Sequence, residues 1–400
     1  MNTSARFAAI DVFRGIAVLI VLLYHFTSRI PPAAAGLDRQ DMFFVPFGGI
    51  GVYLFYVISG YCIFFTLRRA PTLGVFSVKR ISRIYPAYLA SIPFVLLSLT
   101  LFPLPSIPEW DFRTEEITAI DVVANMFFAR DLGFPWVNGS YWSLLVELKY
   151  YVFVVLVSVL FASNRRFLAG FSLFTAGSTG TWLLLSLLVA NGLIAPSGSV
   201  EALLLVTKHV FIAPYLPFFL MGMLAVRLHD DMSGWPLPAY GAAMLACAGI
   251  IYLVLMDLAG GQYFPNVELQ GSLAFLLFAA AFTWFIVIAS HRNPKPPEIR
   301  KPGPLTIVRL GWHGAITALQ RVGLVSYSLY LIHEPLGIGL MVFIDGRVPG
   351  YVSVPLIVML CYLLAEGFAF LFEWRFRKPV ETGALWLFDR VPAFRRAPLT

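Results

Sequence analysis

The chain has 400 residues, of which 59% are hydrophobic and only 13% charged, and its formal net charge is +7. Soluble domains carry about a quarter charged and about half apolar residues, so this composition excludes an ordinary soluble domain, a disordered chain and a coiled coil. Long apolar runs indicate an integral membrane protein instead. The three cysteines lie far apart inside apolar runs, which predicts buried thiols and no metal site.

Runs of about 20 apolar residues, enough to cross a hydrocarbon core, recur along the whole chain. They cover residues 9–29, 50–67, 84–102, 140–161, 168–193, 203–226, 238–258, 270–290, 322–344 and 352–374. The sequence therefore predicts an all-α, polytopic membrane helix bundle of about ten transmembrane helices. Residues 1–375 are predicted to form one transmembrane domain, and residues 376–400 a cytoplasmic C-terminal tail.

Lysine and arginine residues gather in alternate connecting segments, which sets the predicted orientation. The segments on the side of the N-terminus hold most of them, including the basic stretch 292–321, whereas segment 103–139 on the other side is acidic. Because cytoplasmic loops are enriched in Lys and Arg, both termini are predicted to be cytoplasmic. Basic residues that flank apolar runs also argue against a nucleic-acid partner.

The first span carries Arg14 toward the cytoplasm and His25 near the outer end. Ionisable groups in a bilayer cost about 2.5–3.5 kcal/mol each on insertion scales and usually face a cavity and have a function. The distance between them is about three helical turns, so both side chains lie on one face, about 16 Å apart along the axis. The alternative is that Arg14 snorkels to the headgroups and His25 bonds a backbone carbonyl.

A basic segment, residues 77–85, follows the second span and contains Arg80 and Arg83. On a short helical turn at the cytoplasmic face, these two guanidinium groups form a fork suited to phosphate. The alternative is a simple topology signal or a contact with anionic lipid.

The fourth span begins with a polar face, because Ser143 and Glu147 are four residues apart. Glu147 lies about as far below the outer surface as His25, and a carboxylate beside an imidazole fixes its tautomer and raises its basicity. A Glu147–Lys149 pair is the alternative, although these side chains point about 200° apart on a helix. Trp142 is either a substrate contact or an interfacial aromatic residue.

The ninth span carries Ser326, Tyr330 and His333 on one face near mid-membrane. Pro335 frees a backbone carbonyl there, which a membrane helix tolerates only beside a cavity or a neighbouring helix. His333 either lines a pocket or is a structural histidine.

The stretches just described, in this order, resemble the membrane acyltransferase-3 family, which acylates surface polysaccharides and related glycans. The matching residues are 11–15 with 24–26, 51–55 with 59–61, 80–86, 142–147 and 326–333. The resemblance implies that Arg14 and His25 are essential and that Arg80 and Arg83 handle the acyl donor. The family's E-R-P or E-K-P near the last span is altered here: residues 376–379 read Phe-Arg-Lys-Pro, and Glu373 lies upstream.

Residues and resemblance together predict an O-acyltransferase of the bacterial cytoplasmic membrane. Cytoplasmic acetyl-CoA or another acyl-CoA is the expected donor, and a hydroxyl of a saccharide, oligosaccharide or glycolipid at the outer side is the acceptor. His25 and Glu147 are the predicted catalytic pair, with His25 as general base. The predicted substrate-binding residues are Arg14, Arg80, Arg83, Trp142, Ser143, Tyr330 and His333. No bound cofactor or metal is expected, and membrane lipid surrounds the bundle.

Two other functions remain open from the sequence. Intramembrane charges also line transport paths, so the chain could be a transporter or flippase of a glycan or lipid. It could also be a polytopic sensor or assembly partner without chemistry.

Overall fold

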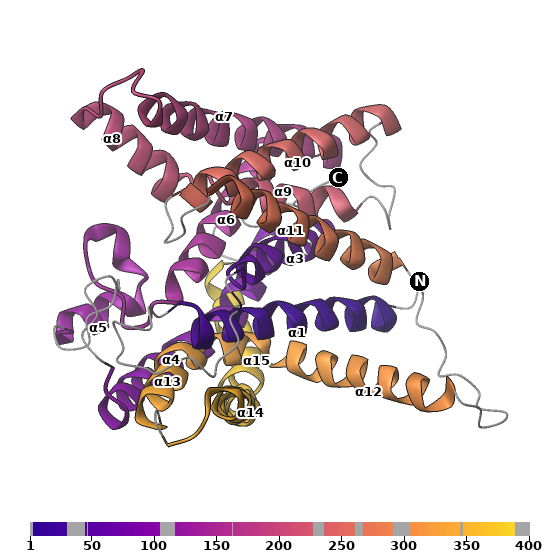
Figure 1. The fold of residues 1–400 in the computed structure, drawn as a ribbon. Coiled ribbons are helices and arrows are strands. Elements are labelled where there is room, and N and C mark those ends of the chain that lie inside the picture. The colour runs from indigo at the N-terminus through magenta and orange to yellow at the C-terminus, as the bar shows by residue number, and fades with distance from the viewer. Residues whose placement is uncertain are drawn as a thin grey trace. The chain divides into compact units, whose positions relative to one another are not determined.

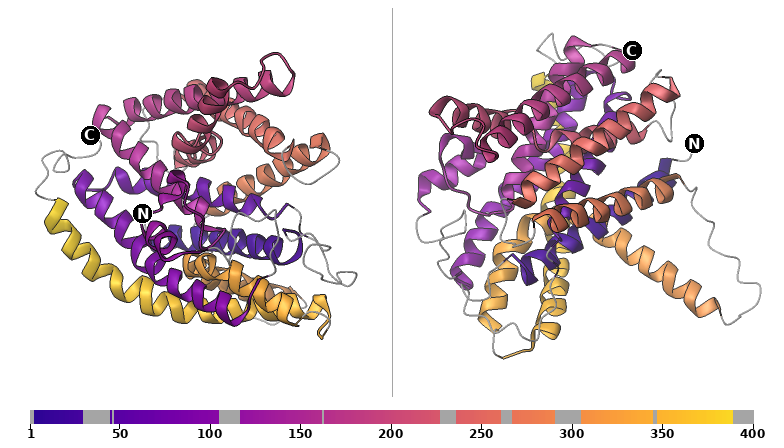
Figure 2. Two further views of the ribbon diagram at one scale, coloured as in Figure 1. Left: turned by 90° about the vertical axis from the view of Figure 1, so that its left-hand side faces the viewer. Right: turned by 45° about the horizontal axis from the view of Figure 1, so that its top comes forward.

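The computed structural model describes residues 3–29, 45, 47–104, 117–161, 163–226, 236–260, 267–290, 305–344 and 347–388. The described residues are mainly helical and contain no strand, as the ribbon views show (Figures 1 and 2). The predicted all-α membrane bundle is therefore confirmed.

The helices follow one another along the chain. They are α1 Thr3–Thr27, α3 Ile50–Leu67, α4 Leu73–Leu101, α5 Ala119–Met126, the 3₁₀ turn η2 Ala129–Leu132, α6 Tyr141–Leu160, α7 Asn164–Ala190, α8 Gly198–Leu205, the π-helix η3 Val206–Val210, α9 Leu216–Ala225, α10 Leu237–Gly260, α11 Val267–Ser290, α12 Leu305–Leu324, α13 Ser326–Ile344, α14 Gly350–Phe368, the π-helix η5 Ala369–Trp374 and α15 Arg375–Phe388.

Among the described residues, 8 helical stretches are long and apolar enough to cross a membrane. They are Ala9–Thr27, Ile50–Leu67, Leu73–Leu101, Tyr141–Leu160, Asn164–Ala190, Pro238–Met256, Ser326–Ile344 and Gly350–Trp386. Each corresponds to one predicted span. The span predicted at 270–290 lies in α11, of which Ser272–Thr283 is a shorter apolar helix. The cytoplasmic placement of the termini stays a prediction.

The sixth predicted span, 203–226, is wrong as a single crossing helix. A π-turn and an irregular stretch separate α8 from α9. Ile212 in this stretch has φ 49°, in the left-handed region that a β-branched residue rarely adopts. Pro214 disfavours helical backbone at the residue before it, so the apolar run is broken although its hydropathy is continuous.

The polar stretches of the sequence are also partly helical. The end of the basic segment 292–321 belongs to α12, and the start of the predicted tail 376–400 belongs to α15. Residues 105–116 of the acidic segment, 292–304 of the basic segment and 389–400 of the tail lie outside the described residues. The division into a membrane domain and a tail stays a prediction.

The chain forms two compact units. The first comprises Met1–Val52, Ile81–Ser143 and Val287–Glu381, and the second comprises Tyr53–Arg80, Leu144–Ile286 and Thr382–Thr400. Each unit is thus assembled from segments that are distant in sequence.

In the first unit α1 packs against α12 and α13, and α13 packs against α14. Two glycines set the distance between α1 and α12: Gly15 faces the backbone carbonyl of Leu319, and Gly323 faces that of Asp11. A methyl group at either glycine would collide with the opposite backbone. This close packing holds the polar residues of α1 at fixed positions next to α13.

The segment before α6 is held by buried polar contacts in the same unit. The Asn125 side chain donates to the carbonyls of Asp121 and Pro135, both at 2.8 Å, and accepts from the amide of Val137 at 3.1 Å. Hydrogen bonds from the Thr118 side chain and backbone amide lower the pKa of the Asp121 carboxyl, which caps the start of α5. These contacts fix the chain that leads into the candidate site.

In the second unit α3 and α9 pack closely through glycines. Gly60 faces the carbonyl of Phe219, and Gly222 faces that of Val57. The ring of Phe219 stacks on Tyr150 with centroids 3.9 Å apart and an interplanar angle of 14°. Apolar and aromatic burial of this kind stabilises the unit around α9, all of whose residues are buried.

Candidate active site

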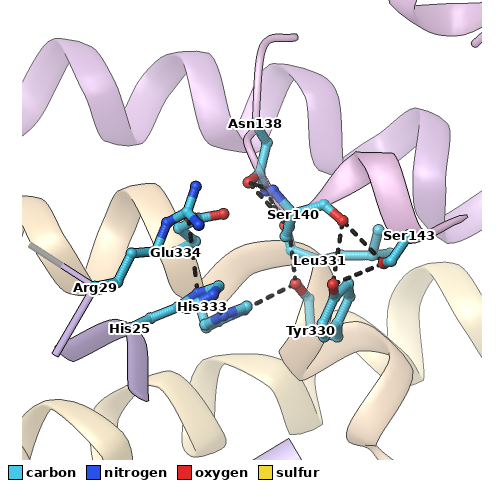
Figure 3. A network of polar contacts seen from close by, with 9 residues as sticks. All are labelled: His25, Arg29, Asn138, Ser140, Ser143, Tyr330, Leu331, His333 and Glu334. Atoms are coloured by element: carbon cyan, nitrogen blue, oxygen red, sulfur yellow. Dashed lines mark hydrogen bonds and ion pairs between the residues drawn. The ribbon is translucent and has the colours of Figure 1, made fainter. Parts of the chain in front are cut away.

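Two buried histidines meet in the first unit, His25 from the end of α1 and His333 from α13 (Figure 3). Nδ1 of His25 and Nε2 of His333 are 2.9 Å apart. The rings are stacked, with centroids 4.9 Å apart and an interplanar angle of 16°. The structure therefore brings together two of the predicted site residues from opposite ends of the chain.

The hydrogen bond on the other side of His333 determines which nitrogens carry protons. His333 Nδ1 lies 2.8 Å from the carbonyl oxygen of Tyr330, which can only accept, so this nitrogen donates. In the neutral ring, His333 Nε2 then holds a lone pair and accepts the proton on His25 Nδ1. Assigned from the network in this way, the tautomer of His25 has its lone pair on Nε2. His25 can thus accept a proton at Nε2.

A proline in α13 explains why a polar loop residue reaches this helix. Pro335 has no amide hydrogen, so the carbonyl of Leu331, four residues earlier, has no helical donor. The side chain of Asn138 donates to that carbonyl at 2.9 Å. The same side chain accepts from the amide and hydroxyl of Ser140, at 3.0 and 2.9 Å. The proline-freed carbonyl predicted from the sequence is therefore satisfied by a neighbouring segment.

Hydroxyl groups surround the Tyr330 end of the network. The hydroxyls of Tyr330 and Ser143 are 2.7 Å apart, and each also lies within hydrogen-bond distance of the carbonyl of Ser140, at 3.2 and 3.1 Å. The Tyr330 ring lies beside His333, with centroids 5.5 Å apart. The structure thus places Ser143, Tyr330 and His333 in one connected network with His25, as Figure 3 shows.

An ion pair borders the histidines in the same unit. Oε1 of Glu334 lies 3.0 Å from Nε of Arg29 and 3.8 Å from Nδ1 of His25. The Glu334 side chain is fully buried, whereas the Arg29 side chain is 27% exposed. A buried carboxylate is costly unless it is paired, so Arg29 stabilises the charged form of Glu334.

A second ion pair lies within α1 and joins Arg14 to Asp11. Arg14 Nη1 is 3.6 Å from Oδ1 of Asp11 within the same helix. Arg83, from α4, also interacts electrostatically with Asp11. Asp11 therefore connects two of the predicted donor-binding arginines, a link that was not predicted from the sequence.

Arg80 and Arg83 lie within α4, which runs on past Pro86, so the predicted short helical turn is wrong. The helix continues because the apolar residues on both sides of the arginines are buried along it. The side chain of Arg80 is itself buried, with its guanidinium carbon 5.8 Å from the ring centroid of Phe76. The role of both arginines in donor binding stays a prediction.

In a comparison with protein families, the model of an acyltransferase domain, acyltransferase-3, matches residues 7–374. The chain belongs to the acyltransferase-3 family. Searches of curated proteins and of solved structures give no match. The family and the apolar helices together make the protein a membrane acyltransferase.

Glu147, the second predicted catalytic residue of this acyltransferase, lies in the second unit. Its Oε1 accepts hydrogen bonds from Ser59 at 2.7 Å and from Tyr151 at 2.5 Å. Lys149, the alternative partner, donates to the carbonyl of His209 at 2.6 Å. The role of Glu147 in orienting His25 stays a prediction. Trp142 is half-buried, and its substrate contact also stays a prediction.

The altered terminal motif of this family member has a structural place. Glu373, in the π-helix η5, is buried and accepts a hydrogen bond from the Ser328 hydroxyl at 2.9 Å. It therefore ties η5 to α13, the helix that carries His333. Among the described residues, no group of His, Cys, Asp and Glu side chains is arranged to hold a metal ion.

Four side chains of the network were not predicted as site residues: Arg29, Asn138, Ser140 and Glu334. Glu334 had a signal, because it is an ionisable residue within an apolar span and adjoins His333. Arg29 is the last residue of the first predicted span, where a basic residue is ordinary, so it gave no signal. Asn138 has no signal in the sequence, since its function depends on the carbonyl of a helix that is distant along the chain.

Proposed function

We propose that this acyltransferase moves an acyl group from cytoplasmic acyl-CoA to a hydroxyl of a saccharide or glycolipid. The family resemblance favours an acetyl group, with acetyl-CoA as the donor. The acceptor would be presented at the outer side of a bacterial cytoplasmic membrane. The observation that carries the proposal is the chain from Tyr330 carbonyl to His333 to His25, because it leaves a lone pair on His25 Nε2.

In this proposal His25 Nε2 takes the proton of the acceptor hydroxyl as its oxygen attacks the thioester carbonyl. The carbon–sulfur bond then breaks, and the thiolate of CoA leaves with the proton that His25 held. The products are an ester and free CoA thiol, and the imidazole returns to its starting state. His333 is a positioning residue here, because it holds the tautomer and orientation of His25.

Hydroxyl donors next to the histidines could stabilise the oxyanion of the tetrahedral intermediate. Tyr330 and Ser143 are the candidates, since their hydroxyls lie in the same network as His333. Buried, preorganised donors of this kind lose little energy to reorganisation when charge develops. Glu147 is also proposed as a catalytic residue, with its carboxylate orienting His25.

The donor would be held by arginines, because guanidinium groups bind phosphates in a bidentate manner. Arg80, Arg83 and Arg14 are the proposed contacts, and the Asp11 carboxylate would compete with the donor for Arg14 and Arg83. Trp142 is proposed to contact substrate. On donor binding, Arg14 and Arg83 would exchange the Asp11 carboxylate for the phosphates of the donor.

The test uses membranes that contain the protein, ¹⁴C-acetyl-CoA on the cytoplasmic side and a surface-glycan extract of the cells that carry the protein. The expected result is label in the glycan as an alkali-labile ester, in proportion to the amount of protein. Movement of glycan across the membrane without label would instead indicate a transporter and overturn the proposal.

A further inference from the structure

We propose that Glu334 and Arg29 set the charge balance of the catalytic base, with Glu334 as the positioning residue that offsets the cation formed when His25 takes a proton. The inference rests on the proposed function, in which His25 is the base. It assigns a task to two residues that the family motifs and the predicted site leave without one.

The geometry brings a negative and a positive charge to the same imidazole. Glu334 Oε1 is 3.8 Å from His25 Nδ1 and 3.0 Å from Arg29 Nε. Glu334 is adjacent in sequence to His333, so one turn of α13 presents both the ring that orients His25 and the carboxylate beside it. Arg29 is placed by the end of α1, where its amide bonds the carbonyl of Tyr24 at 2.9 Å.

The charges balance differently before and after proton uptake. In the resting state the Arg29–Glu334 pair is neutral and both histidines are neutral. When His25 Nε2 gains a proton, the two rings share one positive charge, either on His25 or, if the Nδ1 proton moves across, on His333. Glu334 then faces two cations, and its carboxylate stabilises the new one.

The groups that face His25 from its surroundings are few among the described residues. From α13 they are His333 and Glu334. From the end of α1 they are Arg29 and Tyr24, whose ring centroid lies 5.5 Å from that of His25. On the other helices packed against α1, Arg321 of α12 and Glu366 of α14 both interact with Tyr362.

The sign of each substitution follows from this arrangement. Glu334→Gln keeps the shape but removes a negative charge close to His25, so protonated His25 is destabilised and the acid limb of the kcat–pH profile moves to lower pH. Arg29→Gln removes a positive charge close to the same site, so protonated His25 is stabilised and the limb moves to higher pH. At the distances observed, each shift should be about one pH unit or more.

The experiment measures kcat against pH for both variants, with ¹⁴C-acetyl-CoA and the glycan extract as substrates, in the full-length protein in nanodiscs. Glu201→Gln and Arg347→Gln, which change exposed residues that are not members of the network, are the matched controls and should leave the limb in place. Size-exclusion profiles and melting temperatures establish that each variant folds. If one variant does not fold, the direction of shift in the other decides.

Opposite shifts in the two variants support the proposal, because loss of a purely structural ion pair would lower the rate without moving the limb in opposite directions. Coincident limbs, or shifts in the same direction, overturn it. His25→Ala separates this outcome from the proposed function. If His25→Ala still transfers label, the proposed base is wrong; if it does not and the limbs coincide, only the role of Glu334 and Arg29 is wrong.

Discussion

One proton between two imidazole rings decides which nitrogen of His25 is basic. The carbonyl of Tyr330 accepts from His333 Nδ1, and this single contact determines the direction of the next hydrogen bond to His25. The Tyr330 carbonyl is not protonated under ordinary conditions, so it keeps His333 in one tautomer. His333 in turn orients His25, as a carboxylate does in other base–orienter pairs.

Substituting His333 by Ala should lower kcat by about 10²-fold, because His25 loses the partner that fixes its tautomer and orientation. The KM for acyl-CoA should change little, since His333 lies in the histidine network and not among the predicted phosphate-binding arginines. The measurement is steady-state acetyl transfer. His209→Ala, which alters an exposed histidine, is the control. A kcat within about twofold of the wild type would show that His333 does not orient the base.

Asn138 has a structural task in the same network, because its side chain satisfies the carbonyl that Pro335 leaves without a donor. Asn138→Ala should lower the free energy of unfolding by about 1–3 kcal/mol, since buried polar groups on two segments lose their partner. Thermal unfolding in detergent measures this. The matched control is Asn191→Ala, which removes an exposed amide bonded to a helix carbonyl and should cost less than about 1 kcal/mol. Equal effects of the two substitutions would contradict this role.

At the scale of elements, α1 is positioned by backbone contact with α12. Gly323 and Gly15 leave no space for a side chain between the helices, so the register of α1, and with it the depth of His25, depends on glycine. This helix contact was not predicted from the sequence. Most of α12 falls within 292–321, which its basic residues indicated to be a connecting segment.

Gly323→Ala should therefore destabilise the protein by about 1–3 kcal/mol and lower the transfer rate, because α1 must move to admit the methyl group. Gly314→Ala, on the same helix but facing open space, should be neutral or stabilising by up to about 1 kcal/mol. Melting temperatures of the two variants provide the comparison. If Gly323→Ala were as stable as Gly314→Ala, close packing of α1 on α12 would be wrong.

At the scale of the whole molecule, most crossing helices followed from hydropathy, and helical spacing placed Tyr330 and His333 on one face of their helix. The contact of His25 with His333 did not follow, because the predicted partner of His25 was Glu147. The break within 203–226 did not, because hydropathy measures composition and Pro214 acts on backbone conformation. Asn138 and Arg29 were also missed, since each takes its role from a helix that only tertiary packing brings near. Sequence spacing reports one helix at a time.

The central claim is that Nε2 of His25 accepts the acceptor's proton, and rate and binding measured together on His25→Ala test it most directly. Label transfer from ¹⁴C-acetyl-CoA to glycan should fall to background, while the Kd for acyl-CoA, measured by calorimetry in nanodiscs, stays within about threefold of the wild type. Loss of transfer with intact donor binding is the predicted result. Transfer by His25→Ala at a rate within about twofold of the wild type would contradict the account.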